Sequence, residues 1–536
     1  MKQQHEMQCL AWSRFQQAVR FNRQIGLYDR VKTNENYFIG NQWEGVRSGG
    51  LPTPVFNFLK RVVLFQVASI TSDNISMQAA PLLPTAQYSP GRMEEIASVL
   101  NPQFEAIFER NRLVTMLREM TRNAAVDGDG CMYFYFDSTV ENGQPVKGEI
   151  TAEVVENTRV HFGNPNVRDP QKQPWIIISR RMLADDARRL AHQRGIRDDS
   201  AIRPDQADFQ SRFDSYTDDK VTVLTHFWRD PESGRIWISE STETVLLKKP
   251  TDTGLHRYPL IWLCWDYIQD CYHGQSMITG LIPNQNFINK IFALTGVSLL
   301  ATAFPKVVYD RNRLPEWDGG VGTAVGVAGN VEGVAKVMNP PTVNPQVTEF
   351  MELCIDRTQS LLGASEAALG EARPDNTSAI IALQRAASTP MALTKQNLYQ
   401  AVEDMGRIFL DMIGVQYGVR YVQQGSQAVL FDFAQLQGCP IGVKLDVGAS
   451  SYWSEIASLQ TLEQLLSQDK ISLRQYLERV PNGYLVRRQE LLEELRGTAE
   501  GEAGGIELNR ERSLDSLPIT GKNSPLHTRL RQMGGV

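Results

Sequence analysis

Apolar residues recur at helical spacing through roughly the first 120 residues of the chain. The stretches QCLAWSRFQQAV and NFLKRVVLFQVASI place an apolar side chain at every third or fourth position, and the turn-forming sequence GNQWEGVRSGGLPTP separates them. A further helix is expected near 101–126. The N-terminal part is therefore predicted to be mainly helical.

The pattern changes after residue 130 to short runs rich in β-branched and aromatic residues, bounded by Gly, Pro, Asn and Asp. These runs predict strands at 131–137, 149–156, 158–163, 174–179, 220–228, 235–239 and 244–248. An Arg-rich helix, RRMLADDARRLAHQRG, is expected at 180–195 within this strand-rich region, and six Arg fall in 180–197. Its Arg residues alternate with Asp185, Asp186, Asp198 and Asp199, which favours a solvated helix face over a nucleic-acid-binding surface. The middle of the chain is thus expected to be β-rich or α+β.

Residues 274–303 form the most unusual segment, because Lys290 is their only charged residue. A helix with so few charges must be covered on nearly all sides. Its most apolar part, 291–304, is shorter than the roughly 20 residues that cross a membrane. We therefore expect a helix buried against protein.

A small β excursion is expected at 304–345, where KVVYD and VAKVM flank a Gly-rich run. The helix expected at 346–363 has one apolar face and a second face carrying Glu349, Glu352 and Asp356. An exposed loop, 364–376, follows. From Ser378 a long helix is expected, broken or kinked at Pro390 because Pro lacks a backbone donor. A β or irregular patch near 425–447 leads to a helical C-terminal part.

Composition bounds the class of protein. The 536 residues include 42% hydrophobic and 22% charged residues, with a net charge of -6. This composition is typical of a folded globular chain of two to four regions and gives no bulk attraction to nucleic acid or anionic lipid. The six scattered Cys residues are interpreted as reduced thiols, and the first residues lack a signal-peptide pattern.

The sequence lacks the common catalytic and cofactor-binding motifs. No Walker A or Rossmann glycine pattern is present, and no HExxH or GxSxG occurs. The sequence DGDG at 127–130 is interpreted as a turn, because the later Glu of a calcium loop is missing. His161, His226, His256 and His273 have apolar or aromatic neighbours, which favours structural roles. We therefore expect no enzyme, no cofactor and no metal.

The order of four sequence features resembles the portal, or head–tail connector, proteins of tailed bacteriophages. The features are YFIGNQW at 37–43, NAAVDGDGCMYFYFD at 123–137, YPLIWLCWDY followed by HGQSMITGLIPNQNFINK within 258–290, and NTSAIIALQRAA at 376–387. The resemblance spans about 30–495, and it depends on the order of the features more than on any one of them.

The resemblance implies an α+β portal subunit with a mixed α/β wing, a helical stem, a small β clip and a helical crown. The implied regions are 1–273 (wing), 274–303 (first stem helix), 304–345 (clip), 346–363 (second stem helix), 364–376 (tunnel loop), 377–452 (long kinked helix and return to the wing), 453–497 (crown) and 498–536 (flexible tail). A second alignment would place the clip near 200–250.

The resemblance also implies a function. Such a protein forms a homo-oligomeric ring, a dodecamer in the family's form, at one capsid vertex of a virion assembled in the bacterial host cytoplasm. Double-stranded DNA passes through the ring during packaging and ejection. The implied partners are the terminase large subunit, head-completion and tail adaptor proteins, and the major capsid and scaffolding proteins, with no membrane.

Site residues follow from the same alignment. Channel-lining residues facing DNA are expected to be Glu349, Glu352, Asp356, Glu366, Glu371, Arg373 and Asp375. Contacts of the clip with its partners are expected from Arg311, Arg313 and Trp317. An acidic lining holds a polyanion weakly enough for it to move. The alternative for the acidic helix face is an ordinary solvated surface, and the alternatives for the chain are a nuclease-like DNA-acting enzyme and a monomeric scaffold or adaptor.

Overall fold

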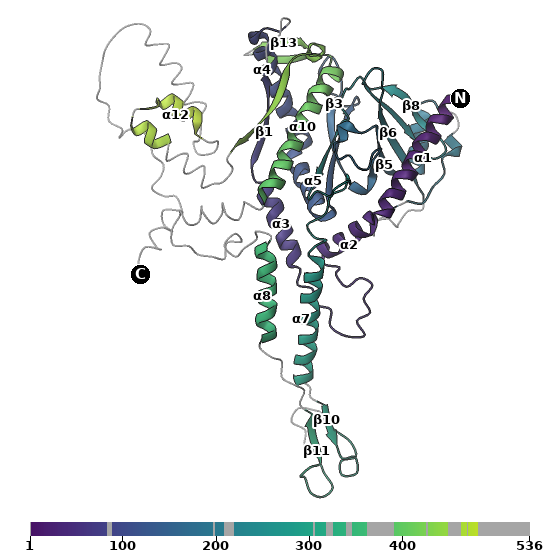
Figure 1. Cartoon of the computed structure of the whole chain (residues 1–536), viewed down its shortest axis with the longest axis vertical. Coiled ribbons are helices and arrows are strands. Elements are labelled where there is room, and N and C mark those ends of the chain that lie inside the picture. The colour runs from purple at the N-terminus through teal and green to yellow at the C-terminus, as the bar shows by residue number, and fades with distance from the viewer. Residues whose placement is uncertain are drawn as a thin grey trace. The chain divides into compact units, whose positions relative to one another are not determined.

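The computed structural model, drawn in Figure 1, describes most of the chain. The described residues are 2–82, 88–196, 199–207, 209, 219–303, 306–317, 325–338, 346–361, 391–424, 427–448, 462–468 and 470–480. The chain divides into two compact units, Met1–Ser450 and Ser451–Val536. In the second unit, helix α12 (Leu473–Arg479) begins with a capping box, in which the Ser472 hydroxyl accepts from the Gln475 backbone N–H.

The N-terminal region is mainly helical, as predicted. Its helices are α1 (Lys2–Gln24), α2 (Leu27–Ile39), α3 (Phe58–Ile70), α4 (Pro90–Asn111) and α5 (Leu113–Asp127). The single helix expected near 101–126 is instead two, because Arg112 adopts a left-handed conformation with φ of 53° and separates α4 from α5. A strand that the sequence analysis did not predict, β1 (Asn74–Pro81), lies between α3 and α4.

Antiparallel sheets form the middle of the chain and confirm the predicted strands. The three-stranded sheet has the order β3-β2-β9, and the five-stranded sheet has the order β4-β5-β6-β7-β8. The bounds are β2 (Asp129–Asp137), β3 (Glu149–Val155), β4 (Val160–Phe162), β5 (Trp175–Leu183), β6 (Lys220–Arg229), β7 (Ile236–Ser241), β8 (Leu246–Asp252) and β9 (Leu260–Cys264). Helix α1 packs on the five-stranded sheet, since Phe15 and Val19 share a core with Ile177 and Leu224.

The Arg-rich helix is shorter than expected. It is α6 (Ala184–Gln193), and the residues before it belong to β5 because they pair with β6. Arg188 binds Asp185, with 2.7 Å between Nη1 and Oδ1, and Arg189 binds Asp186. These pairs fit the solvated-face interpretation, because the acidic residues neutralise the basic ones locally.

A pair of neighbouring helices, α7 (Ile282–Ala303) and α8 (Gln346–Leu361), extends from this body, and the short strands β10 (Lys306–Tyr309) and β11 (Ala335–Met338) lie beyond it (Figure 1). The expected β excursion and the second helix are confirmed within the described residues. The first helix was expected from residue 274, but it begins at Ile282. Gln275 instead pairs with Asp266 in a β-bridge, and Pro283 suits the first turn of a helix.

The chain returns to the body through α10 (Ala392–Gln416), β12 (Val419–Gln424), β13 (Gln427–Asp432) and β14 (Ile441–Gly448). β14 pairs antiparallel with β1, which joins the two ends of the first unit. The β patch expected near 425–447 is thus confirmed. The first part of the expected long helix, from Ser378 to its break at Pro390, lies outside the described residues.

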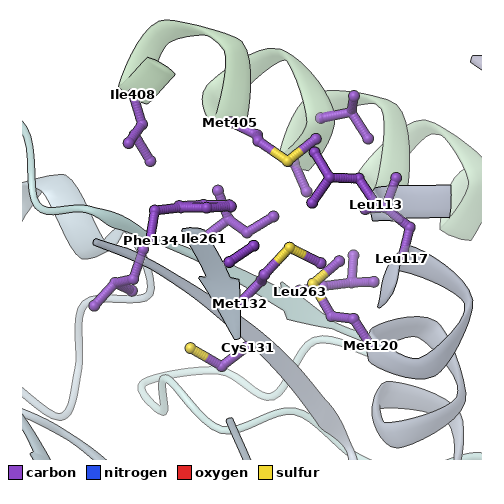
Figure 2. Close-up of a cluster of buried hydrophobic side chains, with 14 of the residues drawn as sticks. Leu113, Leu117, Met120, Cys131, Met132, Phe134, Ile261, Leu263, Met405 and Ile408 are labelled. Atoms are coloured by element: carbon purple, nitrogen blue, oxygen red, sulfur yellow. The ribbon is translucent and has the colours of Figure 1, made fainter. Parts of the chain in front are cut away.

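The largest core forms where α5 and α10 pack on β2 and β9. Figure 2 shows this cluster, which includes Leu113, Leu117, Met120, Cys131, Met132, Phe134, Ile261, Leu263, Met405 and Ile408. Helices α5 and α10 lie more than 250 residues apart in sequence, so this core joins distant parts of the chain. The architecture is α+β, as predicted.

Candidate functional site

Two of the sequence features that carry the resemblance meet at the start of α7. The Tyr37 hydroxyl donates to Asn286 Oδ1 at 2.6 Å, and Asn289 Nδ2 donates to Gln42 Oε1 at 2.6 Å. Gln42 and Asn289 are both buried. Asn286 and Asn289 are therefore explained as polar residues of a charge-poor helix, because each forms a hydrogen bond with a polar side chain of the segment 37–43.

The loop 44–56 is attached to the same helix. Gln285 Nε2 donates to the Phe56 carbonyl oxygen at 2.7 Å, and the ring of Phe56 stacks on that of Phe292 with 3.7 Å between centroids. At the start of the loop, Trp43 Nε1 donates to the Pro54 carbonyl oxygen at 2.9 Å. The contacts of Phe56 attach the end of the loop to α7, and the Trp43–Pro54 hydrogen bond ties the two ends of the loop together.

A second meeting point joins the DGDG turn to the segment before α7. Asp129 is fully buried, and its Oδ1 accepts from the Gly274 backbone N–H at 2.6 Å. Its Oδ2 lies 2.7 Å from His273 Nδ1, and His273 Nε2 lies 3.2 Å from Asn22 Oδ1 on α1. The turn interpretation is confirmed, since Gly128 ends α5 with φ of 102° and Asp129 begins β2.

The buried histidines also have structural roles. Burial lowers the pKa of His161 to about 3, with His273 as the second cause. Burial also lowers the pKa of His226 to about 3, with the Arg14 guanidinium as the second cause. Arg14 Nη1 lies 3.0 Å from His226 Nε2, so the neutral imidazole accepts this hydrogen bond. His256 differs, since its side chain is 58% exposed and lies beside Asp411.

Helix α8 packs on α7 through one of its faces. The Phe287 and Phe350 rings pack nearly perpendicular to each other with 6.1 Å between centroids, and Asn284 Nδ2 donates to Thr358 Oγ1 at 3.2 Å. Met351 and Thr358 are buried on this side.

The acidic residues predicted on α8 lie on the opposite face. Glu349, Glu352 and Asp356 are exposed, and their spacing places them on one stripe. That stripe faces away from Met351 and Thr358. Within the described residues, none of the three carboxylates forms an ion pair. We call Glu349, Glu352 and Asp356 the acidic stripe.

A third face of α8 exposes two large apolar side chains beside Arg357. Phe350 and Leu353 are about half exposed, and so is Phe287 of α7. Helical geometry puts Phe350 and Leu353 roughly a quarter turn from the acidic stripe. Exposed apolar residues of this size on adjacent helices are typical of an interaction surface. We call Phe287, Phe350 and Leu353 the helix-pair surface.

The remaining predicted channel residues, Glu366, Glu371, Arg373 and Asp375, lie outside the described residues. The structure therefore brings together only the three carboxylates of α8.

The predicted partner-contact residues lie beside β10. Arg311 is exposed, whereas Arg313 Nε lies 3.5 Å from Asp310 Oδ2. The indole of Trp317 stacks on Tyr309 with 5.8 Å between centroids and is 41% exposed. The three residues thus lie in one short segment. Arg313 and Trp317 also contact other residues of that segment, Asp310 and Tyr309.

The sequence did not predict the exposed apolar residues around this segment. Val308, Val325 and Val331 are exposed there. No periodic signal marks them, because they lie on a short strand and in a Gly-rich stretch.

The chemistry of the described residues gives no sign of a metal centre, since no group of three or more His, Cys, Asp or Glu side chains among them could hold an ion. Within that part of the chain, no helix is both long and apolar enough to cross a membrane.

Comparison with known proteins supplies the family. A family model described as phage P22-like portal protein matches residues 12–418, about three quarters of the chain. The match runs from α1 to the turn after α10 and includes the helix pair and β10–β11. No curated protein matches the chain.

Proposed function

The chain belongs to the phage P22-like portal protein family, and we propose that it assembles into a homo-oligomeric ring whose channel carries double-stranded DNA into and out of the capsid. The family is structural and non-enzymatic, and it implies a component of the phage virion. The ring would occupy one vertex of the capsid, with twelve copies as the family's usual form.

The arrangement of faces on α8 is the observation that best supports this proposal. One face packs on α7, one is apolar and exposed, and one carries Glu349, Glu352 and Asp356. A ring built through the apolar face leaves the acidic stripe away from the contact, free to face a channel. Carboxylates repel phosphate, so DNA would slide past without the tight binding that neutralisation of its backbone produces.

The regions of the chain take their roles from this arrangement. We propose α7 and α8 as the stem, the β10–β11 segment as the clip, and the body formed by 1–273 and 391–448 as the wing. The segment 364–376 would be the tunnel loop and 453–497 the crown.

The clip is the proposed docking site for other proteins. Arg311, Arg313 and Trp317 would contact the terminase large subunit during packaging and head-completion or tail adaptor proteins afterwards. Nucleotide hydrolysis would belong to the terminase. Capsid and scaffolding proteins would contact the outer part of the wing.

Negative-stain electron microscopy and native mass measurement of the purified chain test the proposal. We expect rings with a central hole and a mass that is a whole multiple of 60.3 kDa. A chain that stays monomeric at concentrations that permit assembly would contradict the ring and favour a scaffold or adaptor. Metal-dependent DNA cleavage by the monomer would favour the nuclease-like alternative.

A further inference from the structure

The loop 44–56 leaves several apolar side chains about half exposed. Val46, Leu51, Val55 and Phe56 are each between 39% and 54% exposed. Arg47 is the only charged residue from 45 to 56, is exposed, and forms no ion pair within the described residues. We call Val46, Arg47, Leu51, Val55 and Phe56 the loop surface.

The loop surface is held in place although it is exposed. The hydrogen bonds of Gln285 with Phe56 and of Asn289 with Gln42 hold it on α7, together with the stacking of Phe56 on Phe292. The hydrogen bond from Trp43 to Pro54 closes the loop on itself. A loop anchored in this way presents its apolar side chains at little entropic cost on binding.

The loop surface and the helix-pair surface lie on nearly opposite sides of α7. Phe287 faces α8, whereas Gly296 faces the loop, where a Cβ atom would lie 3.9 Å from Pro52. These two residues are nine positions apart, or about two and a half helical turns, which places them on opposite sides. Figure 1 also draws the loop beside α7 on the side away from α8.

Two different apolar surfaces on opposite sides of one subunit are what a head-to-tail ring requires, because each copy then offers one surface to each neighbour. Their net charges are also opposite. The loop surface carries Arg47, whereas the exposed side of α8 carries Glu349, Glu352 and Asp356 against one cation, Arg357, which follows Leu353 by one helical turn.

We propose that the loop 44–56 of one copy docks on the α7–α8 helix-pair surface of the next copy. In this contact Leu51 and Val55 lie against Phe350 and Leu353, and Arg47 faces the edge of the acidic stripe. The inference rests on the proposed ring and adds which two surfaces close it.

Cross-linking of introduced cysteines tests this contact in the full chain. The five cysteines that are at least partly exposed are first replaced by Ser or Ala: Cys9, Cys264, Cys271, Cys354 and Cys439. Leu51→Cys and Leu353→Cys are then combined in one chain, treated with a short bis-maleimide and run on a denaturing gel. We expect a ladder of covalent oligomers that extends well beyond the dimer.

Mixing the two single variants is the internal control. Each chain then holds only one half of the contact, so the ladder stops at the dimer, and neither single variant alone cross-links. A pair that keeps Leu353→Cys but moves the other cysteine to the exposed Val114 of α5 should give no ladder. If the first pair prevents ring formation, Val46→Cys with Phe350→Cys replaces it.

The outcomes separate this inference from the proposed function. Rings that form without a ladder from either pair, or with an equal ladder from the Val114 control, overturn the docking of the loop and leave the ring intact. Chains that form neither rings nor ladders overturn both. A ladder specific to the loop and helix-pair cysteines supports the contact.

Discussion

The body of the protein and the α7–α8 helix pair use their side chains in contrasting ways. In the body, charged and polar groups from distant segments are buried together. Glu149, for example, accepts from Arg420 Nη1 at 3.1 Å, from the Tyr417 hydroxyl at 3.2 Å and from Asn142 at 2.6 Å. In the helix pair, apolar groups such as Phe350 and Leu353 are half exposed, and the carboxylates are unpaired within the described residues.

The difference indicates which contacts stabilise each region. The body completes its contacts within one chain, so its stability is a property of the monomer. The helix pair leaves apolar surface in water, and burying that surface requires another molecule. Substitutions in the body should therefore change the free energy of unfolding, whereas substitutions on the helix pair should change assembly.

The largest effect on folding is expected at Glu149. The Glu149→Ala substitution leaves the buried guanidinium of Arg420 without its carboxylate, and loss of one partner of a buried pair costs about 3–5 kcal/mol. Urea denaturation of the purified chain measures the loss.

A matched control for this change is Glu141→Ala. Glu141 binds Lys147 in a pair whose side chains are 79% and 65% exposed, and such pairs contribute about 0–1 kcal/mol. Equal losses from the two substitutions would contradict the view that burial sets the difference.

A glycine substitution in the body should have the next largest effect. A Cβ atom at Gly130 would overlap the carbonyl oxygen and side chain of Met120, because β2 approaches α5 closely there. We expect Gly130→Ala to lower the free energy of unfolding by about 1–3 kcal/mol, as overpacking usually does. Gly280→Ala is the control, since nothing lies within 4 Å of a Cβ at that position. A tolerated Gly130→Ala would show that the close approach can relax.

Acid should destabilise the body through its buried histidines. His226 has its pKa lowered to about 3, while an unfolded His has a pKa near 6.5. The unfolded chain therefore binds a proton that the folded chain does not. The free energy of unfolding decreases as the pH falls below about 6.5, and it continues to decrease until the pH reaches about 3. From about pH 6 to about pH 5 this histidine alone should cost about 1 kcal/mol.

The His226→Gln substitution should remove that part of the pH dependence, whatever it does to stability at neutral pH. Urea denaturation at the two pH values measures the difference. An unchanged pH dependence in His226→Gln would mean that His226 is already charged in the folded chain.

The smallest effect on folding is expected on α8. Replacing Glu349 and Glu352 by Gln and Asp356 by Asn should change the free energy of unfolding by no more than about 0.5 kcal/mol, because these positions are exposed. In the proposed ring the same change should strengthen retention of DNA at low salt, which filter binding across a salt series measures.

The matched control uses three exposed carboxylates of α4, replaced by Gln: Glu94, Glu105 and Glu109. It removes the same charge from the body. If both triple variants retain DNA equally, the acidic stripe does not face the channel.

The sequence alone determined most of the elements and the class of the fold. Runs rich in β-branched and aromatic residues predicted β2 to β8, and helical spacing predicted α8, because these signals are local. The family could also be identified from four short features. The charge-poor segment correctly predicted a largely apolar α7, and the acidic stripe could be listed from residue spacing alone.

Only the tertiary structure determined which distant residues these features contact. Tyr37 meets Asn286 and Gln42 meets Asn289 because chain segments about 250 residues apart pack together, and no local pattern encodes that pairing. The same holds for Asp129 with His273, and for Arg112, whose left-handed backbone divides α4 from α5. Local periodicity fixes which face of an element is apolar, whereas long-range packing fixes which faces meet and which remain exposed for a partner.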